Sequence, residues 1–508
     1  MMSKPMNQKR YLFFFLAIAV VSECFYIGLC LSPTVWADEI YSLNIIKKSI
    51  LDIVRLSSLE YHPPLYFILL KIFTLPFGYS VWSGKVFSSL CFLYIILYGG
   101  ISFKKLFGEK TSLLFMFLFP LYSFSMNYAA EIRMYSLGAA FVFTNGILAY
   151  RCYYSDHVRN WILFCITGIC CCYIHDYSML SAAVIYVLLF VALVISKREK
   201  LRPWLIVSAV TTILYLPWLT LIIKQLGTEK DGYWIPPVTF QSFKQYFRSL
   251  FFGPSVHLGA VIQTRKGTIC ALLIFLLYLS AFIKLLLKKN KPDIVTVVFM
   301  AGVPFLTMAF GVVASILITP MFDMHFLVPA APFISAFLAV CLGKTTGKIL
   351  CSLVLAASVL NGGLTYALIW RARNIPLENS MDTAFLSQYG DVDAYIVRGY
   401  VDAGYFLLSQ LQHYGLDKPV FLNDSEGMSS DQDALINIII SIYDKYEKWS
   451  RFDPEKNDSV LLFGYSEPDI DDLLPYYDVS LITNNAMVEI GGGFYRYVYS
   501  VYLLTGKT

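Results

Sequence analysis

Charged residues are scarce in this chain: Asp, Glu, Lys and Arg together make up 15% of its 508 residues. Soluble domains average about 25%, and disordered chains have few apolar residues. Here 57% of the residues are hydrophobic and the mean hydropathy is +0.60. No soluble core could bury that much apolar side chain, so the composition excludes both classes and predicts a membrane protein.

Cysteine is absent from residue 352 onwards, because all eleven cysteines lie earlier in the chain. No disulfide framework can therefore support the C-terminal part. The one cluster is Cys170-Cys171-Cys172. Three consecutive residues point in different directions around a helix, which favours packing over a shared metal ion.

Nucleotide-binding motifs are absent as well. The sequence contains no P-loop, no dinucleotide-binding fingerprint and no nucleophile elbow. Gly491-Gly492-Gly493 lies between two strand-like runs and opens no helix, so we interpret it as a turn. An activated sugar used outside the cytoplasm would then have to be lipid-linked, because nucleotide sugars stay inside.

Charge divides the chain into two parts of opposite sign. From Arg371 to the end there are 10 Lys and Arg against 21 Asp and Glu, a net charge of −11. The first 370 residues carry 30 basic and 14 acidic residues, a net charge of +16. The basic residues sit in short loops between apolar runs, so the basic half does not imply nucleic acid.

Apolar runs of membrane-spanning length predict about eleven transmembrane helices. Lys and Arg recur in alternate gaps between the runs, and the intervening short gaps have almost none. This positive-inside pattern places the N-terminus in the cytoplasm and residues 371–508 outside. The predicted spans are 11–32, 81–102, 111–128, 134–150, 161–174, 178–196, 204–222, 268–287, 294–318, 326–342 and 349–370.

Two domains follow: a transmembrane domain over residues 1–370, with long outside loops at 33–80 and 223–267, and an outside α/β domain over 371–508. Short surface helices are expected in the first loop. In the tail the pattern alternates between strands and helices. Strands are expected at 393–398, 419–423, 459–465, 478–483 and 495–503, and helices at 401–414, 431–449 and 467–477.

Ionisable residues at membrane depth are costly and usually functional, and five groups of them fall on the predicted outside face. Each also has a structural interpretation: helix capping for Asp38-Glu39, an ion pair for Glu131 and Arg133, and interfacial polarity for the His175-Asp176-Tyr177 loop. His62 and the pair Asp323 and His325 could equally be loop residues. The functional interpretations are a general base at Asp38 and an arginine that binds phosphate at Arg133.

A divalent metal such as Mg or Mn is one further possibility, because carboxylate oxygens are its preferred ligands. Asp38 and Glu131 are the first candidates for that site, with Glu39, His175 and Asp176 as further ones. Nothing in the spacing of these residues fixes such a site.

The order of motifs resembles bacterial GT-C glycosyltransferases of the glycosyltransferase 39/83 type, which include protein O-mannosyltransferases and the aminoarabinose transferase. The resemblance covers about residues 10–340. Its most specific piece is Glu131-Ile132-Arg133-Met134-Tyr135-Ser136-Leu137. The other pieces are Trp36-Ala37-Asp38-Glu39, His62-Pro63-Pro64 and Gly78-Tyr79-Ser80.

The resemblance implies transfer of a sugar from a polyprenyl-phosphate donor to a lipid, glycan or protein acceptor, with inversion, at the outer face of the cytoplasmic membrane. Asp38 matches the family's acidic residue and would be the general base. The substrate-binding positions implied are Glu39, His62, Lys85, Glu131, Arg133, Tyr135, His175, Asp176, Tyr177 and His325.

Two of those positions depart from the family pattern. Relatives often carry Arg-Tyr where this chain has His325-Phe326, and an arginine where it has Lys85. If those arginines bind phosphate, this chain binds it differently or uses another donor. The alternatives from other classes are a flippase or transporter of lipid-linked sugars and a non-catalytic protein of cell-envelope assembly.

Overall fold

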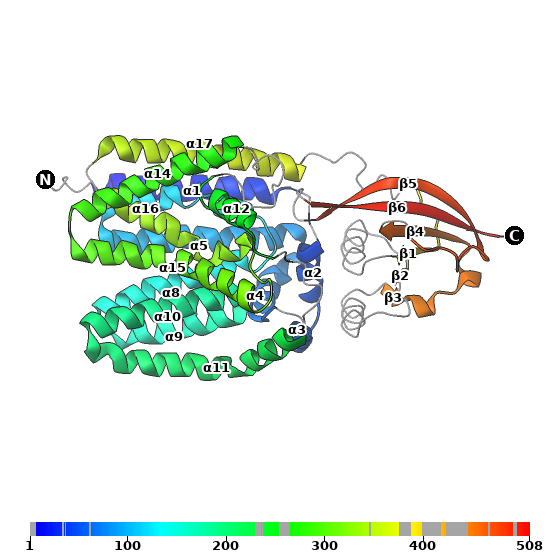
Figure 1. The fold of residues 1–508 in the computed structure, drawn as a ribbon, viewed down its shortest axis with the longest axis horizontal. Helices are drawn as coiled ribbons and strands as arrows, with labels where there is room; N and C mark the ends of the chain where they lie inside the picture. The colour runs from blue at the N-terminus through cyan, green and yellow to red at the C-terminus, as the bar shows by residue number, and fades with distance from the viewer. Residues whose placement is uncertain are drawn as a thin grey trace. The chain divides into compact units, whose positions relative to one another are not determined.

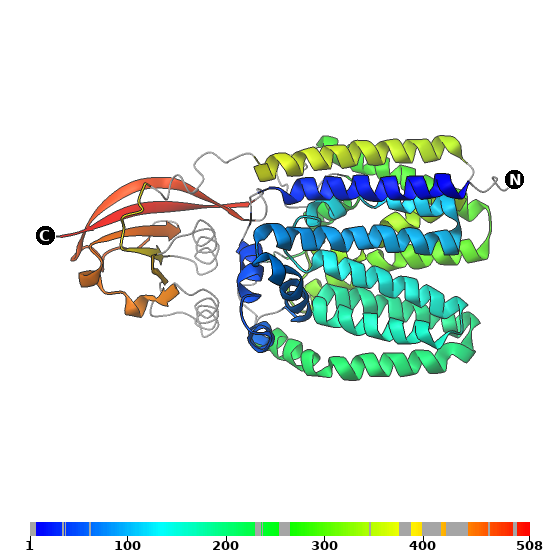
Figure 2. The same ribbon diagram turned by 180° about the vertical axis from the view of Figure 1, so that it is seen from behind.

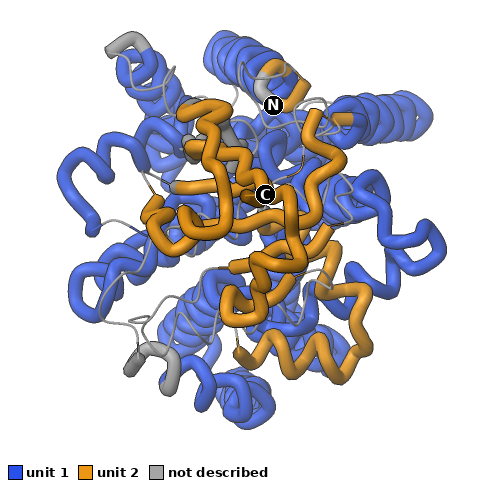
Figure 3. The backbone as a smooth tube through the Cα atoms, turned by 90° about the vertical axis from the view of Figure 1, so that its right-hand side faces the viewer, with its two compact units in different colours: residues 1–31, 60–370 blue, residues 32–59, 371–508 orange. Residues whose placement is uncertain are grey.

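The computed structural model forms two compact units, which are described separately (Figure 3). Unit 1 comprises residues 1–31 and 60–370, and unit 2 comprises residues 32–59 and 371–508. The described residues are 7–32, 35, 37–59, 62–228, 235, 237–252, 265–344, 347–374, 388–398, 418–422, 446–465, 468–490 and 495–507.

Unit 1 is helical throughout its described part, and its long helices run side by side (Figure 1). The apolar runs of the sequence build them, with lysine and arginine near many of their ends. The long and short helices described in unit 1 include α1 (Gln8–Cys30), α4 (Leu65–Thr74), α5 (Val81–Phe107), α6 (Glu109–Leu118), α7 (Ser123–Tyr128), α8 (Tyr135–Tyr154), α9 (Val158–Ile174), α10 (Asp176–Ser196), α11 (Leu201–Thr228), α12 (Phe240–Phe251), α14 (Arg265–Leu287), α15 (Lys291–Leu317), η4 (Met324–Ala330), α16 (Pro332–Lys344) and α17 (Lys348–Asn374).

Seven helices in the described ranges are long and apolar enough to cross a membrane: α1, α5, α10, α11, α14, α15 and α17. The pair η4 and α16, which is bent by 55° at the break between them, brings the count to eight if the two helices form one span. Each of the eleven predicted segments contains helix, but 111–128 is not continuous. It consists of α6 and α7, because Pro120 between them has no backbone N–H and cannot continue a helix.

Helix α8 lies at the centre of unit 1 and contacts α5, α9, α10 and η4. Small residues let the helices approach closely. A Cβ atom on Gly146 of α8 would lie 2.4 Å from the ring of Phe333 in α16. The outer helix α1 packs on α5 and α6. It also runs beside α17 (Figure 2), where Gly28 of α1 lies against Tyr366.

The described part of unit 2 contains the short α-helices α2 (Ala37–Ile45) and α3 (Ile50–Leu59) and a six-stranded sheet. Four strands are parallel, in the order β3-β2-β1-β4, and β6 and β5 follow antiparallel to complete the sheet. The strands are β1 (Ala394–Arg398), β2 (Val420–Leu422), β3 (Tyr446–Lys448), β4 (Ser459–Tyr465), β5 (Tyr477–Ile490) and β6 (Tyr495–Gly506).

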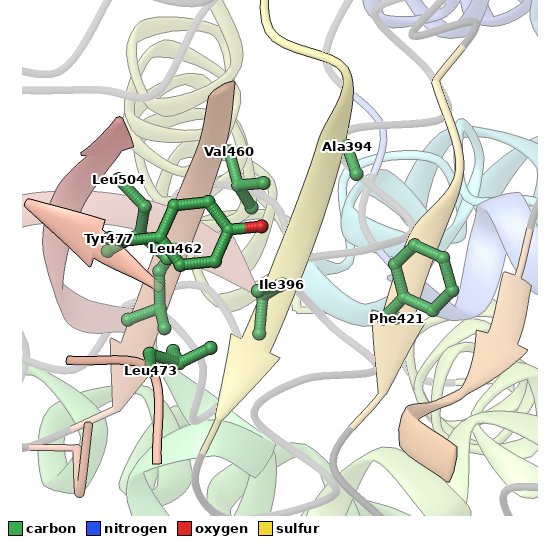
Figure 4. Packing of buried hydrophobic residues seen from close by; sticks show 8 residues of the cluster. All are labelled: Ala394, Ile396, Phe421, Val460, Leu462, Leu473, Tyr477 and Leu504. Carbon is green, nitrogen blue, oxygen red and sulfur yellow. The ribbon is translucent and has the colours of Figure 1, made fainter. Parts of the chain in front are cut away.

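The sheet buries both of its faces in the region of β1 and β4. On one face Ile396 of β1 lies opposite Leu462 of β4, in a cluster with Phe421 and Tyr477 (Figure 4). On the other face Tyr395 and Phe463 are also buried. Near-continuous apolar runs of this kind are typical of parallel strands that are covered on both sides.

Two predictions for the tail were wrong. Residues 446–448, expected at the end of a helix, form the strand β3. Residues 471–476, expected in a helix, form turns, where Asp and Pro disfavour a helix interior. The predicted helix at 401–414, the segment 431–445 and the triple glycine at 491–493 lie outside the described residues, while all five predicted strands contain strand.

Candidate functional site

The loops between helices of unit 1 bring Arg133 and His62 into contact. Pro63 and Pro64 end the loop that carries His62, and α4 begins directly after them at Leu65. Arg133 lies in the short connection between α7 and α8 and is only 3% exposed. Its Nη2 atom lies 2.8 Å from Nε2 of His62.

The chemistry of the two groups fixes the direction of this hydrogen bond. A guanidinium has donors only, so Nε2 of His62 must be the acceptor. His62 is then a neutral imidazole in this arrangement, with its proton on Nδ1. The positive charge of the pair therefore belongs to Arg133, and His62 orients it.

The backbone before Arg133 is held by α5. The hydroxyl of Ser88 donates to the carbonyl of Glu131 at 2.5 Å, and the N–H of Arg133 donates to the same carbonyl at 2.9 Å. Lys85 lies one turn before Ser88 on α5 and is fully buried. Helix α5 thus positions the Glu131–Arg133 motif through its buried polar side.

His175 connects α9 to α10 and is buried. Its Nδ1 atom accepts a hydrogen bond from the backbone N–H of Tyr177 at 3.1 Å, which caps α10. Burial, together with the charges of His325 and Arg133, lowers the pKa of His175 to about 3. The ring is therefore neutral at physiological pH, with its proton on Nε2 as a fixed donor.

Aromatic rings join these polar groups. The ring centroid of Tyr135, the first residue of α8, lies 5.5 Å from that of His175 and 5.4 Å from that of His325. The His62 and His175 centroids are 6.0 Å apart. Tyr177 donates its hydroxyl to the carbonyl of Met321 at 2.6 Å, which ties α10 to the segment before η4.

His325 lies in η4 beside Asp323, which caps that short helix. The carboxylate of Asp323 accepts from the backbone N–H of Met324 and lies 3.5 Å from Nδ1 of His325. Both His325 and Met324 are buried. This end of unit 1 therefore brings together the buried guanidinium of Arg133, three imidazoles and the carboxylate of Asp323.

The other predicted carboxylates lie on different elements of the chain. Asp176 begins α10, and its Oδ1 atom is buried without a hydrogen-bond partner among the described residues. Asp38 and Glu39 form the first turn of α2 in unit 2, where Glu39 is buried. Their negative charges lie at the N-terminus of α2, where the helix dipole favours them.

The described part of the chain contains no group of three or more His, Cys, Asp or Glu side chains placed to hold a metal ion. The divalent metal suggested for Asp38 and Glu131 therefore stays a prediction. The cysteines in this part are free, and Cys171 and Cys172 are buried among apolar side chains.

Two further contacts involve residues to which the sequence assigned no role. Glu23 lies inside the apolar helix α1 and accepts a hydrogen bond from Ser89 of α5 at 2.9 Å. The signal was available, because Glu23 is the only acidic residue in that span. The ring of Phe326, at a position that departs from the family pattern, stacks on Tyr177 with the centroids 4.8 Å apart.

Comparison with solved structures identifies the fold class as the GT-C fold of membrane glycosyltransferases. No protein-family model matches the chain, and no curated protein matches it by sequence. The structure of ArnT from Cupriavidus metallidurans in the apo state aligns with a TM-score of 0.62 at 12% identity, over 97% of this chain and 98% of that one. The same protein bound to undecaprenyl phosphate aligns with a TM-score of 0.58, at the same identity and coverage.

These alignments confirm the predicted fold class, a polytopic helical membrane domain followed by a small sheet domain. Identity of 12% carries the fold and not the activity. The chain is a multi-pass membrane protein.

Proposed function

We propose that this chain is a membrane glycosyltransferase, which transfers a sugar from a polyprenyl-phosphate donor to an acceptor with inversion at the anomeric carbon. The reaction is placed at the outer face of the cytoplasmic membrane, with the N-terminus inside and residues 371–508 outside. The observation that carries the proposal is the contact between Arg133 and His62, a buried cation at the end of a helical bundle. The structure of ArnT with undecaprenyl phosphate shows that a protein of this fold binds such a lipid.

Arg133 suits the task of binding a phosphate leaving group. When the bond between the anomeric carbon and the phosphate oxygen breaks, negative charge develops on the polyprenyl phosphate. A guanidinium held in a buried site stabilises that charge and needs no proton transfer to do so. His62 orients the guanidinium, and the neutral His175 adds a hydrogen-bond donor without adding charge.

Asp38 is assigned as the general base because it matches the acidic residue of the family in the first outside loop. It would take the proton of the acceptor hydroxyl as that oxygen attacks the anomeric carbon. Glu39 would support Asp38 or bind the sugar. A divalent metal at Asp38 and Glu131 is a secondary form of the same proposal and would orient the donor.

The proposal is tested with purified protein in proteoliposomes that contain labelled polyprenyl-phosphate sugars. Wild type is expected to release polyprenyl phosphate, and Arg133→Lys and Asp38→Asn are expected to slow release by about 100-fold or more. Asp52→Asn is the matched control, because Asp52 is an exposed carboxylate in α3. Chelation of divalent ions in the same assay tests the metal.

Three outcomes would contradict the proposal. Equal turnover by Asp38→Asn would remove that residue from the role of base. Movement of the labelled lipid between leaflets without turnover would favour a flippase. Absence of both, with an envelope defect on deletion of residues 371–508 alone, would favour a non-catalytic assembly protein.

A further inference from the structure

Arg398 at the end of β1 is a buried cation that the proposed reaction does not use. It is 6% exposed, while the side chain of its partner Asp472 is about half exposed. Nη1 donates to Oδ1 of Asp472 at 2.5 Å and to the carbonyl of Asp469, and Nη2 donates to Oδ2 of Asp472. The guanidinium carbon lies 4.6 Å from the centroid of Trp449.

Two neighbouring N–H groups on one edge of this guanidinium have no hydrogen-bond partner among the described residues. An arginine has five N–H groups, and three of them are used by Asp469 and Asp472. Nε is buried and has no partner among the described residues. Nε and the second hydrogen of Nη2 point to the same side, so together they form the side-on fork with which arginine binds two oxygen atoms.

The fork is held in a fixed orientation. Asp472 accepts hydrogen bonds from the opposite end of the guanidinium, and the ring of Trp449 lies over one face of the guanidinium. The other side of Trp449 stacks on Phe452, with the ring centroids 4.7 Å apart. A donor pair fixed in this way loses little conformational entropy when a ligand binds.

The position in the sheet also indicates a ligand site. Strands β2 and β3 are added on one side of β1, and the next strand, β4, is added on the other side, so the strand order changes direction between the parallel strands β1 and β4. Arg398 is the last residue of β1 and pairs in register with Gly464 of β4. In open α/β sheets, ligands bind beyond the carboxyl ends of the strands at this topological switch point.

The surroundings favour an uncharged ligand. The charge of Arg398 is already neutralised by Asp472, and residues 371–508 carry a net charge of −11. An added anion would meet an acidic domain without a free counter-charge. A sugar hydroxyl can accept from the fork and also donate to the exposed carboxylate of Asp472.

We propose that the fork formed by Nε and Nη2 of Arg398 binds a pair of neighbouring hydroxyl oxygens of an uncharged saccharide at the switch point of unit 2. In the proposed transferase this saccharide would be part of the acceptor. That role rests on the proposed function, whereas the binding itself does not.

The test measures binding to the full-length protein in phosphatidylcholine nanodiscs, which avoid the sugar headgroups of alkyl glycoside detergents. The probes are the methyl pyranosides of glucose, galactose and mannose, with inorganic phosphate for comparison. Saturation-transfer NMR gives the affinity, and hydrogen exchange reports on residues 394–398, 446–452 and 468–474. At least one methyl pyranoside is expected to bind saturably and to slow exchange in these segments, and phosphate is not.

The variants separate the fork from the charge. Arg398→Lys keeps the charge and removes the fork, so the affinity should fall by about tenfold or more. Arg451→Lys is the matched control, because it makes the same substitution at an exposed arginine of unit 2. Nη1 of Arg451 lies 4.0 Å from Oε2 of Glu447. Arg133→Lys should leave this binding unchanged while sugar transfer falls, so the two proposals fail separately.

If Arg398→Lys does not fold, the NMR and hydrogen-exchange measurements on the wild-type protein alone test the proposal. The proposal is overturned if none of the methyl pyranosides protects these segments, or if only phosphate does. Equal affinities for wild type and a folded Arg398→Lys protein would also overturn it.

Discussion

Arg133 and His62, 71 residues apart in sequence, form a hydrogen bond in which Nη2 and Nε2 are 2.8 Å apart. Because the guanidinium can only donate, the histidine acts as an acceptor that positions it. The pair therefore assigns different tasks to two residues that the sequence resemblance placed together among the substrate-binding positions. Arg133 supplies the charge, and His62 sets the direction of that charge.

Substitution of His62 should separate these tasks. His62→Leu removes the acceptor, and we expect kcat/KM for sugar transfer to fall by about 10- to 100-fold through misplacement of Arg133. His62→Gln offers an amide oxygen as a replacement acceptor and should recover most of that loss. The measurement is release of polyprenyl phosphate over a range of donor concentrations, with Arg159→Lys as an exposed control. Equal losses in Leu and Gln variants would show that His62 does not work as an acceptor.

The buried His175 should make the protein sensitive to acid. Its pKa is about 3 in the folded protein, against an ordinary value of 6.5. Between these values the unfolded chain binds a proton that the native ring does not, so stability falls as the pH drops below about 6.5, by up to about 1.4 kcal/mol per pH unit. Above pH 6.5 this contribution is constant.

His175→Asn keeps an acceptor for the N–H of Tyr177 and removes the titration. Thermal unfolding followed at pH 7.5, 6, 5 and 4 should show a shallower loss of stability for this variant than for wild type. Parallel curves would mean that His175 is not the acid-sensitive group.

Close packing of α5 on α6 should tolerate no added methyl group. A Cβ atom on Gly99 would lie 2.1 Å from the ring of Phe115, and that ring stacks on Phe143 at 5.2 Å, so it has little room to move. Gly99→Ala should therefore destabilise the protein by about 1–3 kcal/mol. Gly363→Ala is the matched control, since open space surrounds Gly363, and it should be neutral or slightly stabilising. Thermal unfolding in detergent gives the comparison, and a Gly99→Ala protein as stable as wild type would contradict it.

Hydropathy predicted the helices of unit 1 well, because the bilayer forces long apolar runs into helices. Hydropathy predicted one helix over α6 and α7, because the apolar run continues through Pro120. The helix itself ends there, because proline has no backbone N–H to donate. In unit 2 the three-residue strand Tyr446–Lys448 was absorbed into a predicted helix. Its pairing with β2 is a long-range contact that no local pattern contains.

The candidate site was predictable in its members and not in its geometry. Buried charge is expensive, so Arg133 and His175 were visible as exceptions in an apolar sequence. The direction of their hydrogen bonds depends on loops far apart in the chain, which sequence spacing does not encode. The partner of Glu23 is Ser89 of α5, 66 residues away, so no local pattern in α1 indicates the hydrogen bond that accommodates this carboxylate.

Lys200 should be a structural lysine whose ammonium holds the end of α8. Nζ donates to the carbonyls of Cys152, Tyr153 and Ser155 at 3.0–3.1 Å and lies 2.8 Å from a carboxylate oxygen of Asp156. These carbonyls belong to the last turn of the helix and to the residue after it, where a cation also matches the helix dipole. Lys200→Met should cost about 2 kcal/mol or more, because buried carbonyls lose a charged donor.

Two companion variants test that assignment. Asp156→Asn should have little effect, because this carboxylate is exposed and the carbonyls are bonded by Lys200 and not by Asp156. Lys200 lowers the pKa of Asp156, so the carboxylate is ionised beside it. Arg198→Met replaces an exposed cation two residues away and should also be mild. Thermal unfolding of the three variants in the same detergent ranks them. An Asp156→Asn protein as unstable as Lys200→Met would show that the ion pair, and not the capping of α8, is the source of the stability.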